Sequence, residues 1–305
     1  MRKWLFIAPL SLLFACGDSE TPTVVEEVNL DDYADRIGYV LGALNAESIM
    51  QSGGKMNELN KELLIQGFED NLSDKDCSDC DDVLLGLFGP YGQDFDTTKI
   101  DTGSSCIGRI TGFRFYTDML GMGGLEKINL DKVKIGFEHG VYDADTLIDE
   151  SEKRTMVQNF LVDINSMNGE KMISAAKNQP GAQVFDNGVV LFTLEEGTGD
   201  YPGATDDVEV EYILTNAVGD TVQSSYDMKK TNPDAGPVYL SLNGGVIPGW
   251  SFVIPKMRVG GKARAYIPWN LAYGEQGGKE SLCFFIELKD FGPQGSLLKQ
   301  QPQMR

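Results

Sequence analysis

Two short runs of apolar and aromatic residues lie beside turn-forming glycines in the last third of the chain. Val-Ile-Pro-Gly-Trp occupies 246–250, and Leu-Ala-Tyr-Gly follows at 271–274. An aromatic ring next to a turn is well placed to line a concave apolar pocket, so for Trp250 and Tyr273 we favour this reading over core packing. A pocket of this kind acts through shape, exclusion of water and a few hydrogen bonds, and needs neither a nucleophile nor a metal.

This part of the chain resembles the FKBP-type peptidyl-prolyl isomerases. The segments that carry the resemblance are, in the family's order, GVVLFTLEEGTGDYPGATDDVEVEY, VIPGW, MRVGGKARAYIPWNLAYG and LCFFIEL. They cover nearly all of 185–292, and VIPGW followed by LAYG at this spacing is a specific signal. The resemblance implies a twisted antiparallel sheet wrapped around one short helix, with no cofactor and no metal.

The chemistry that the resemblance implies is rotation about X-Pro bonds in polypeptide clients. Amide resonance opposes this rotation with a barrier of about 18–20 kcal/mol. The twisted transition state has lost much of the amide's polarity, so a dry apolar pocket favours it over the planar ground state, which water solvates better.

The resemblance assigns pocket roles to individual residues. Trp250 would be the floor under the proline ring, and the Ile247 N–H would donate to a substrate carbonyl. The Tyr273 hydroxyl would hydrogen-bond the peptide, whereas Phe284 could equally be a core residue. The full set is Tyr212, Val246, Ile247, Trp250, Tyr273 and Phe284.

Three pocket positions depart from the family pattern. Val222 stands where the family has a phenylalanine, Gln223 where it has an aspartate, and Val238 where it has an aromatic residue. The loop 275–281 is shorter and lacks the family's Ile-Pro-Pro tip. We therefore expect weakened catalysis or, as the alternative, a non-catalytic module that binds peptide or protein.

The chain changes character near Pro180-Gly181. Before this point apolar residues recur at helical spacing, and after it short apolar or alternating runs are separated by glycine-rich turns, which is typical of strands. The pattern predicts an α+β protein, with a helical region at 31–180, a sheet domain at 181–293 and a polar tail at 294–305.

The helical region contains what we interpret as an internal duplication, at about 33–95 and 106–178. Gly67-Phe68-Glu69 recurs as Gly136-Phe137-Glu138, and Gly38-Tyr39 has a counterpart in Gly112-Phe113. Chance similarity between amphipathic helices is the alternative. The region resembles the N-terminal dimerisation segment of Mip-like and FkpA-like envelope isomerases, which occurs once per chain. Two copies in one chain predict a monomer with an internal pseudo-dimer, and a homodimer is the alternative.

The N-terminus resembles a bacterial lipoprotein signal. A basic start and an apolar run too short to span a bilayer end in Leu-Phe-Ala-Cys at 13–16. This predicts a signal peptide at 1–15, lipid on Cys16, a flexible tether at 16–30, and a protein anchored to a membrane of the cell envelope, facing the periplasm or the exterior. An ordinary cleaved secretory signal is the alternative.

Charge and cysteine content restrict the partners, metal sites and disulfides that we expect. The formal net charge of −20 argues against nucleic-acid binding, since phosphate backbones would be repelled. Cys77, Cys80 and Cys106 predict a structural disulfide whose pairing the sequence leaves open. Zinc is disfavoured because His139 is the chain's single histidine. Cys283, in an apolar strand pattern, is expected to be a small buried residue.

Overall fold

The computed structural model describes residues 28–90, 92, 95–144, 147–232, 236 and 238–297. The predictions for the signal peptide, Cys16, most of the tether and the last part of the tail lie outside these residues. No helix in the described ranges is both long enough and apolar enough to cross a lipid bilayer.

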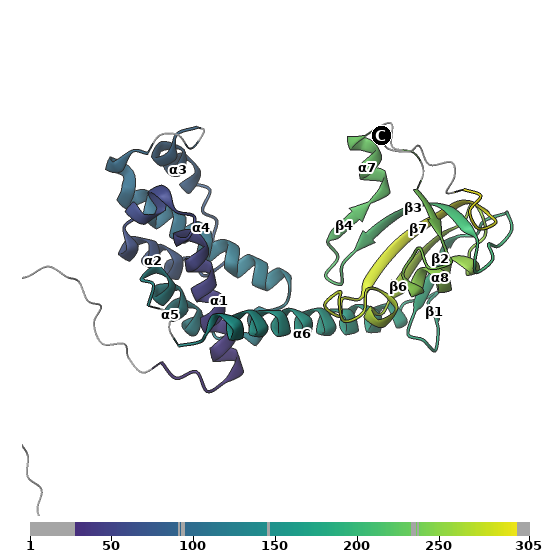
Figure 1. Ribbon diagram of the computed structural model, residues 1–305, viewed down its shortest axis with the longest axis horizontal. Helices are drawn as coiled ribbons and strands as arrows, with labels where there is room; N and C mark the ends of the chain where they lie inside the picture. Colours follow the sequence, from purple (N-terminus) through teal and green to yellow (C-terminus); the bar gives the residue numbers. More distant parts are fainter. Residues whose placement is uncertain are drawn as a thin grey trace, which may run out of the picture.

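Helices make up the first part of the described chain. They are α1 (Tyr33–Met50), α2 (Lys61–Asp70), α3 (Cys80–Phe88), α4 (Ile100–Gly121), α5 (Leu130–Val141) and α6 (Glu150–Lys177). Short 3-10 turns lie at Gly54–Glu58, Thr97–Lys99 and Leu125–Lys127. Figure 1 shows α1 to α5 gathered at one end of the long helix α6 and the sheet at its other end.

The helices pair crosswise between the two halves of this region. Helix α1 packs along α5, and α2 packs along α4. Asn129, the N-cap of α5, donates from Nδ2 to Asp35 of α1 at 2.8 Å, and Asn60, the N-cap of α2, donates to Asp101 of α4 at 2.9 Å. An Asn–Asp hydrogen bond therefore joins α1 to α5, and an equivalent Asn–Asp hydrogen bond joins α4 to α2.

Glycines allow these helices to approach closely. A Cβ on Gly42 of α1 would lie 2.0 Å from the Val133 carbonyl oxygen, and one on Gly108 of α4 would lie 2.1 Å from that of Leu64. Both distances are far below van der Waals contact, so neither position accepts a side chain without a backbone shift.

The two Gly-Phe-Glu motifs meet in the core. The rings of Phe68 and Phe137 stack with centroids 3.7 Å apart and planes 3° from parallel. The Gly-aromatic pairs, in contrast, do not occupy matching positions. Gly38 of α1 lies against Asn129, the N-cap of α5. At the equivalent place in the other helix pair, the Ser104 hydroxyl of α4 accepts the backbone N–H of Asn60, the N-cap of α2, at 2.9 Å. The counterpart of Gly38 is thus Ser104, and the register inferred from Gly112-Phe113 is wrong.

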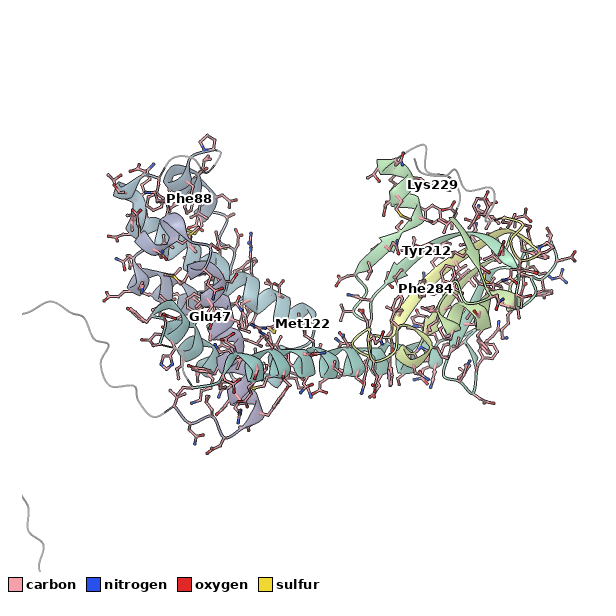
Figure 2. All side chains as sticks on the ribbon, viewed as in Figure 1. Glu47, Phe88, Met122, Tyr212, Lys229 and Phe284 are labelled. Atoms are coloured by element: carbon pink, nitrogen blue, oxygen red, sulfur yellow. A yellow bond between two sulfur atoms is a disulfide. The ribbon has the colours of Figure 1, made fainter. Side chains whose placement is uncertain are left out.

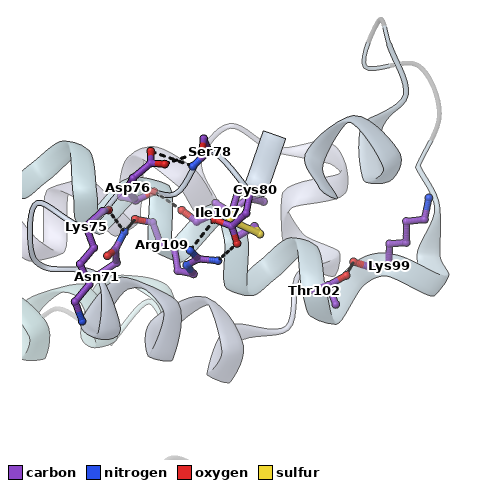
Figure 3. Close-up of a disulfide and its surroundings, with 12 residues drawn as sticks. Asn71, Lys75, Asp76, Ser78, Cys80, Lys99, Thr102, Ile107 and Arg109 are labelled. Atoms are coloured by element: carbon purple, nitrogen blue, oxygen red, sulfur yellow. Dashed lines mark hydrogen bonds and ion pairs between the residues drawn. A yellow bond between two sulfur atoms is a disulfide. The ribbon is translucent and has the colours of Figure 1, made fainter. Parts of the chain in front are cut away.

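A disulfide joins α3 to α4. It links Cys80 to Cys106, with Cα atoms 5.3 Å apart, and leaves Cys77 as a buried free thiol. Arg109, which Figure 3 shows near the disulfide, donates two hydrogen bonds to Asp79, at 2.7 and 2.9 Å. Burial raises the pKa of the Cys77 thiol, so this cysteine stays protonated and unreactive at neutral pH.

The second part of the chain is a seven-stranded antiparallel sheet. Its strands are β1 (Gln183–Val184), β2 (Val190–Glu195), β3 (Asp207–Thr215), β4 (Thr221–Ser224), β5 (Val238–Ser241), β6 (Lys262–Ile267) and β7 (Leu282–Gly292). The order is β1-β2-β6-β7-β3-β4, and β5 also pairs with β3. Between them lie α7 (Ser225–Thr231), α8 (Pro248–Val253) and 3-10 turns at Ile254–Lys256 and Trp269–Leu271. Helix α7 is an addition to the one short helix that the sequence indicated.

Alternation along the strands gives the sheet two different faces. The inner face packs on α8 through residues such as Leu191, Ala265 and Ile286, which are almost fully buried. The back face meets the C-terminal part of α6, where Ile173 and Ala176 pack against Val190 of β2. Helix α6 thereby belongs to both cores, since its N-terminal half packs among the other helices.

Candidate active site

The start of α8 is fixed by the sequence Ile-Pro-Gly-Trp. Ile247 is the N-cap with extended backbone, and Pro248 takes the first helical position, where its missing N–H costs nothing. A Cβ on Gly249 would lie 2.4 Å from the Ile267 side chain, so glycine is needed for α8 to press against β6. Because Ile247 caps the helix, its own amide lies outside the helical hydrogen bonds.

Three predicted pocket aromatics come together on the inner face. Trp250 lies edge-on to Tyr212 and to Phe284, with ring centroids 5.4 and 5.2 Å apart and interplanar angles of 86° and 81°. Tyr212 and Phe284 are themselves 6.5 Å apart, and Figure 2 shows them on neighbouring strands of the sheet. Edge-to-face geometry is the favoured arrangement of aromatic rings and fixes the position of each.

Trp250 is buried, with 3% of its surface exposed, yet its polar atom is unsatisfied. Its indole Nε1–H has no hydrogen-bond partner within the described chain. A buried donor without a partner is rare in native proteins and calls for an explanation; with less than 1 Å² of this atom exposed, a ligand acceptor reaches it only if neighbouring side chains move.

The other predicted residues surround this cluster. Val246 and Ile247 are partly buried and pack against the same core. Tyr273 lies in the turn between the 3-10 helix Trp269–Leu271 and Gly274, and 61% of Tyr273 is exposed. The φ of Gly274 is 67°, a backbone conformation that suits glycine. Burial, and secondarily the nearby Tyr273, raise the pKa of Tyr212, so the Tyr212 hydroxyl remains a protonated donor at neutral pH.

The three departures from the family pattern lie at the edge of the site. Val222 is 59% exposed, in the irregular part of the β3–β4 pairing. Gln223 pairs with Leu214, which is an inner-face residue, but is itself exposed. Val238 is half-buried against the inner core. An aromatic wall and a buried carboxylate are therefore absent from these positions.

A buried polar cluster that the sequence did not suggest holds β3 in place. The Ser225 hydroxyl accepts the Tyr212 backbone N–H at 2.9 Å and donates to the buried Glu211 carboxylate at 2.5 Å. Lys229 of α7 forms a salt bridge with Glu211. The cluster fixes the backbone that carries Tyr212. The sequence did not reveal the cluster, because an acidic residue directly before an aromatic residue in a strand, here Glu211 before Tyr212, is not a signal for a buried polar contact.

None of the described residues forms a group of three or more His, Cys, Asp or Glu side chains able to hold a metal ion. The aromatic cluster offers ring surfaces and the Tyr212 hydroxyl, with the unpaired indole N–H buried behind them. This combination can bind an apolar ring and hydrogen-bond a carbonyl, and it provides no group for nucleophilic attack.

Comparison with known proteins identifies similar sequences and structures. The family model described as "FKBP-type peptidyl-prolyl cis-trans isomerase" matches residues 199–289. The outer membrane protein MIP of Legionella longbeachae is 28% identical over 212 residues, which are 63% of this chain and 85% of that protein. FkpA of Escherichia coli K12 is 29% identical over 55% of this chain and 66% of that protein. The crystal structure of Escherichia coli FkpA aligns with a TM-score of 0.39 at 24% identity, over 63% of this chain and 96% of that one.

The C-terminal sheet, with α8 against its inner face and the aromatic cluster between them, is an FKBP-type domain. The domain belongs to the FKBP-type peptidyl-prolyl cis-trans isomerase family, and the longer chain is similar to the Mip and FkpA proteins.

Proposed function

We propose that the protein is a peptidyl-prolyl cis-trans isomerase that acts on proline-containing polypeptides. The observation that carries the proposal is the edge-to-face cluster of Tyr212, Trp250 and Phe284, with an unpaired indole N–H. In this cluster the proline ring would rest on Trp250, and the Ile247 amide and the Tyr273 hydroxyl would hold the peptide. The site acts by favouring the less polar, twisted amide.

The test is a proline-isomerisation assay on a short peptide and on a refolding protein whose slow step is prolyl isomerisation. The full chain is expected to accelerate both, and Trp250→Leu is expected to lose most of the acceleration. No acceleration by the wild-type chain, with peptide binding intact, would refute the enzyme assignment.

The second candidate function is a binding module that retains the pocket without turnover. It is favoured by the exposed Val222 and Gln223, because the family's aromatic wall and carboxylate have no replacement there. A loss of about 3–4 kcal/mol of transition-state stabilisation would reduce the rate by two to three orders of magnitude. Peptide affinity without rate enhancement would distinguish this function from catalysis.

We also propose that the chain is a lipoprotein of the bacterial cell envelope, anchored through Cys16. The Leu-Phe-Ala-Cys sequence and the relationship to an outer membrane protein support this. Metabolic labelling with a fatty-acid analogue should label the wild-type protein and leave Cys16→Ala unlabelled. Labelling of the variant would contradict the assignment.

We further propose that the helical region arose by duplication and forms an internal pseudo-dimer, so that the chain is a monomer. The crosswise pairing of α1 with α5 and of α2 with α4, with matching asparagine caps, supports this. Light scattering should give the mass of one chain at micromolar concentration. A stable dimer under these conditions would favour the homodimer alternative.

A further inference from the structure

The back face of the sheet holds a second cavity, separate from the aromatic site. Its volume is about 450 Å³, within the range of small-molecule sites. Met172 of α6 lies over one side, and residues 216–219 of the β3–β4 turn form another. The aromatic site is on the opposite face of the same strands, so the two cannot share a ligand.

Strand register builds the floor of the cavity. In one cross-strand row Arg264 lies opposite Phe285, which lies opposite Ile213. In the next row Tyr266 lies opposite Cys283, which lies opposite Thr215. Opposed residues in a ladder point to the same face, so these side chains form one surface with an apolar middle and a cation at its β6 edge.

Charge distinguishes this cavity from its surroundings. Of the described residues that line it, Arg264 alone carries a charge at neutral pH, because burial raises the pKa of both Tyr266 and the Cys283 thiol. Arg264 is exposed and forms none of the salt bridges found in the described chain. Its guanidinium hydrogen-bonds the neutral Tyr266 side chain, and no carboxylate of the described residues neutralises its charge at the mouth of this apolar cavity.

The neighbouring cavity has the opposite character. It shares Asn216, Ala217 and Val218 with the first, so the turn of the β3–β4 hairpin separates the two. Asp118, Asp220 and Glu280 line it, and no lysine or arginine is among its described lining residues. An anion would be repelled there and attracted to Arg264, so the two cavities select for charge as well as for shape.

We propose that the back-face cavity is a binding site for a small amphipathic monocarboxylate, such as a medium-chain fatty acid. The chain would lie over Phe285 and Ile213 beneath Met172, removed from water, and the carboxylate would form a bidentate pair with the Arg264 guanidinium at the mouth. Thr215 and Asn216 also line the cavity, but their donors are already engaged, Thr215 Oγ1 with the Cys283 carbonyl and Asn216 Nδ2 with Asp220, so Arg264 is the group that would hold the carboxylate. Because Met172 belongs to α6, an occupied cavity would strengthen the contact between helix and sheet.

Cys283 provides a direct report of occupancy, since it lines the cavity. The full chain is treated with a thiol reagent at alkaline pH, because burial raises the pKa of the Cys283 thiol, and peptide mapping by mass spectrometry measures labelling of Cys283 separately from the other cysteines. Decanoate at millimolar concentration is expected to slow labelling at least threefold. Decanol, which has the same chain without the charge, should bind about tenfold more weakly, equivalent to about 1.4 kcal/mol.

Variants test the assigned cation. Arg264→Gln should remove the preference for decanoate over decanol. Lys262→Gln is the matched control, because Lys262 is on the same strand and face but is paired with Glu195 at 2.7 Å. Isomerase activity on a short peptide should be unchanged in both, which verifies that each has folded.

Several results would overturn the proposal. These are no protection by decanoate, equal protection by decanol, or decanoate protection that survives Arg264→Gln. Protection by a short apolar peptide with a free C-terminal carboxylate, in the absence of protection by decanoate, would overturn the small-molecule assignment. The outcome does not depend on turnover at the aromatic site, so failure here leaves the isomerase proposal intact.

Discussion

At the scale of single residues, Tyr273 offers the cleanest test of the aromatic site, because 61% of it is exposed. Truncating an exposed side chain changes stability little, usually within about 0.5 kcal/mol. We expect Tyr273→Ala to retain the wild-type denaturant midpoint and to lose about tenfold in kcat/KM, since it removes a hydrogen bond and an apolar wall. Isomerisation of a short peptide measures the loss.

The control is Tyr201→Ala in the same domain, where the side chain is 51% exposed and stacks under Arg258. It should leave kcat/KM unchanged. If the two variants behave alike, Tyr273 has no role in the site and the turn at Gly274 serves only the fold.

The Asp149 carboxyl should make the stability of the long helix α6 depend on pH. It is the N-cap of α6, and hydrogen bonds from the Ser151 hydroxyl and the Glu152 and Ser151 amides lower the pKa of its carboxyl. The pKa is lower in the folded than in the unfolded protein, where it is about 3.9. The stabilisation is therefore complete above that value and is lost as the pH falls through the lower folded pKa.

Asp149→Asn isolates this contribution, because asparagine caps a helix well and does not titrate. Between mildly acidic and strongly acidic pH, the free energy of unfolding of the wild type should fall more steeply than that of the variant. Chemical denaturation monitored by helical circular dichroism measures both slopes. Parallel slopes would show that the Asp149 contact does not persist in solution.

The family resemblance grouped Tyr212, Trp250 and Phe284 in one site, and their rings do lie together, while their role in binding or catalysis stays a prediction. Trp250 and Tyr273 are marked by adjacent glycines and a proline, which are local signals, and Tyr212 and Phe284 follow from the motif order. The pairing of Cys80 with Cys106 was not predictable, because it depends on how α3 packs on α4. The Glu211–Ser225–Lys229 cluster was missed for the same reason, since α7 was not anticipated.

At the scale of elements, the closeness of the crossed helix pairs is the property to test. Gly42→Ala would place a methyl group against the Val133 carbonyl, where the available distance is 2.0 Å. We expect a loss of about 1–3 kcal/mol in the free energy of unfolding, typical of overpacking. Urea denaturation followed by circular dichroism gives the value.

The matched control for this prediction is Gly121→Ala at the end of α4. There an added Cβ meets nothing within 4 Å, and the helical backbone favours alanine. Gly121→Ala should be neutral or slightly stabilising. Equal effects at both positions would mean that the helix spacing adapts and that glycine is not required for the pairing.

The sequence predicted some features of helix pairing and did not predict others. The two Gly-Phe-Glu motifs do meet in the core, where Phe68 and Phe137 stack, and the duplication itself stays a prediction. The Gly-aromatic pairs gave the wrong register, because the glycines that occupy matching helix contacts are Gly42 and Gly108, and these are followed by Ala43 and Arg109. The back-face cavity has no local signal at all, since it forms where α6 crosses the strands.

At the scale of the whole molecule, α6 connects the two domains physically. Its first half lies in the helical core, and its last turns pack on the back face of the sheet (Figure 1). Asn165 and Gly169 add contacts to the loop before β7, where Asn165 donates to the Gly278 carbonyl at 3.0 Å and Gly169 lies against Ser281. A helix shared in this way should hold the domains in a fixed orientation.

Ala176→Asp tests that orientation. Ala176 is 1% exposed against Val190, so a carboxylate there would be buried without a partner and should separate the end of α6 from the sheet. Small-angle X-ray scattering should show a larger radius of gyration, whereas isomerisation of a short peptide should persist because the aromatic site is on the other face. Ala175→Asp, at an exposed neighbouring position, is the control and should leave the scattering curve unchanged. Superimposable curves for the two variants would show that the hydrogen bonds at Asn165 and the packing at Gly169 hold the domains together without the Ala176 contact.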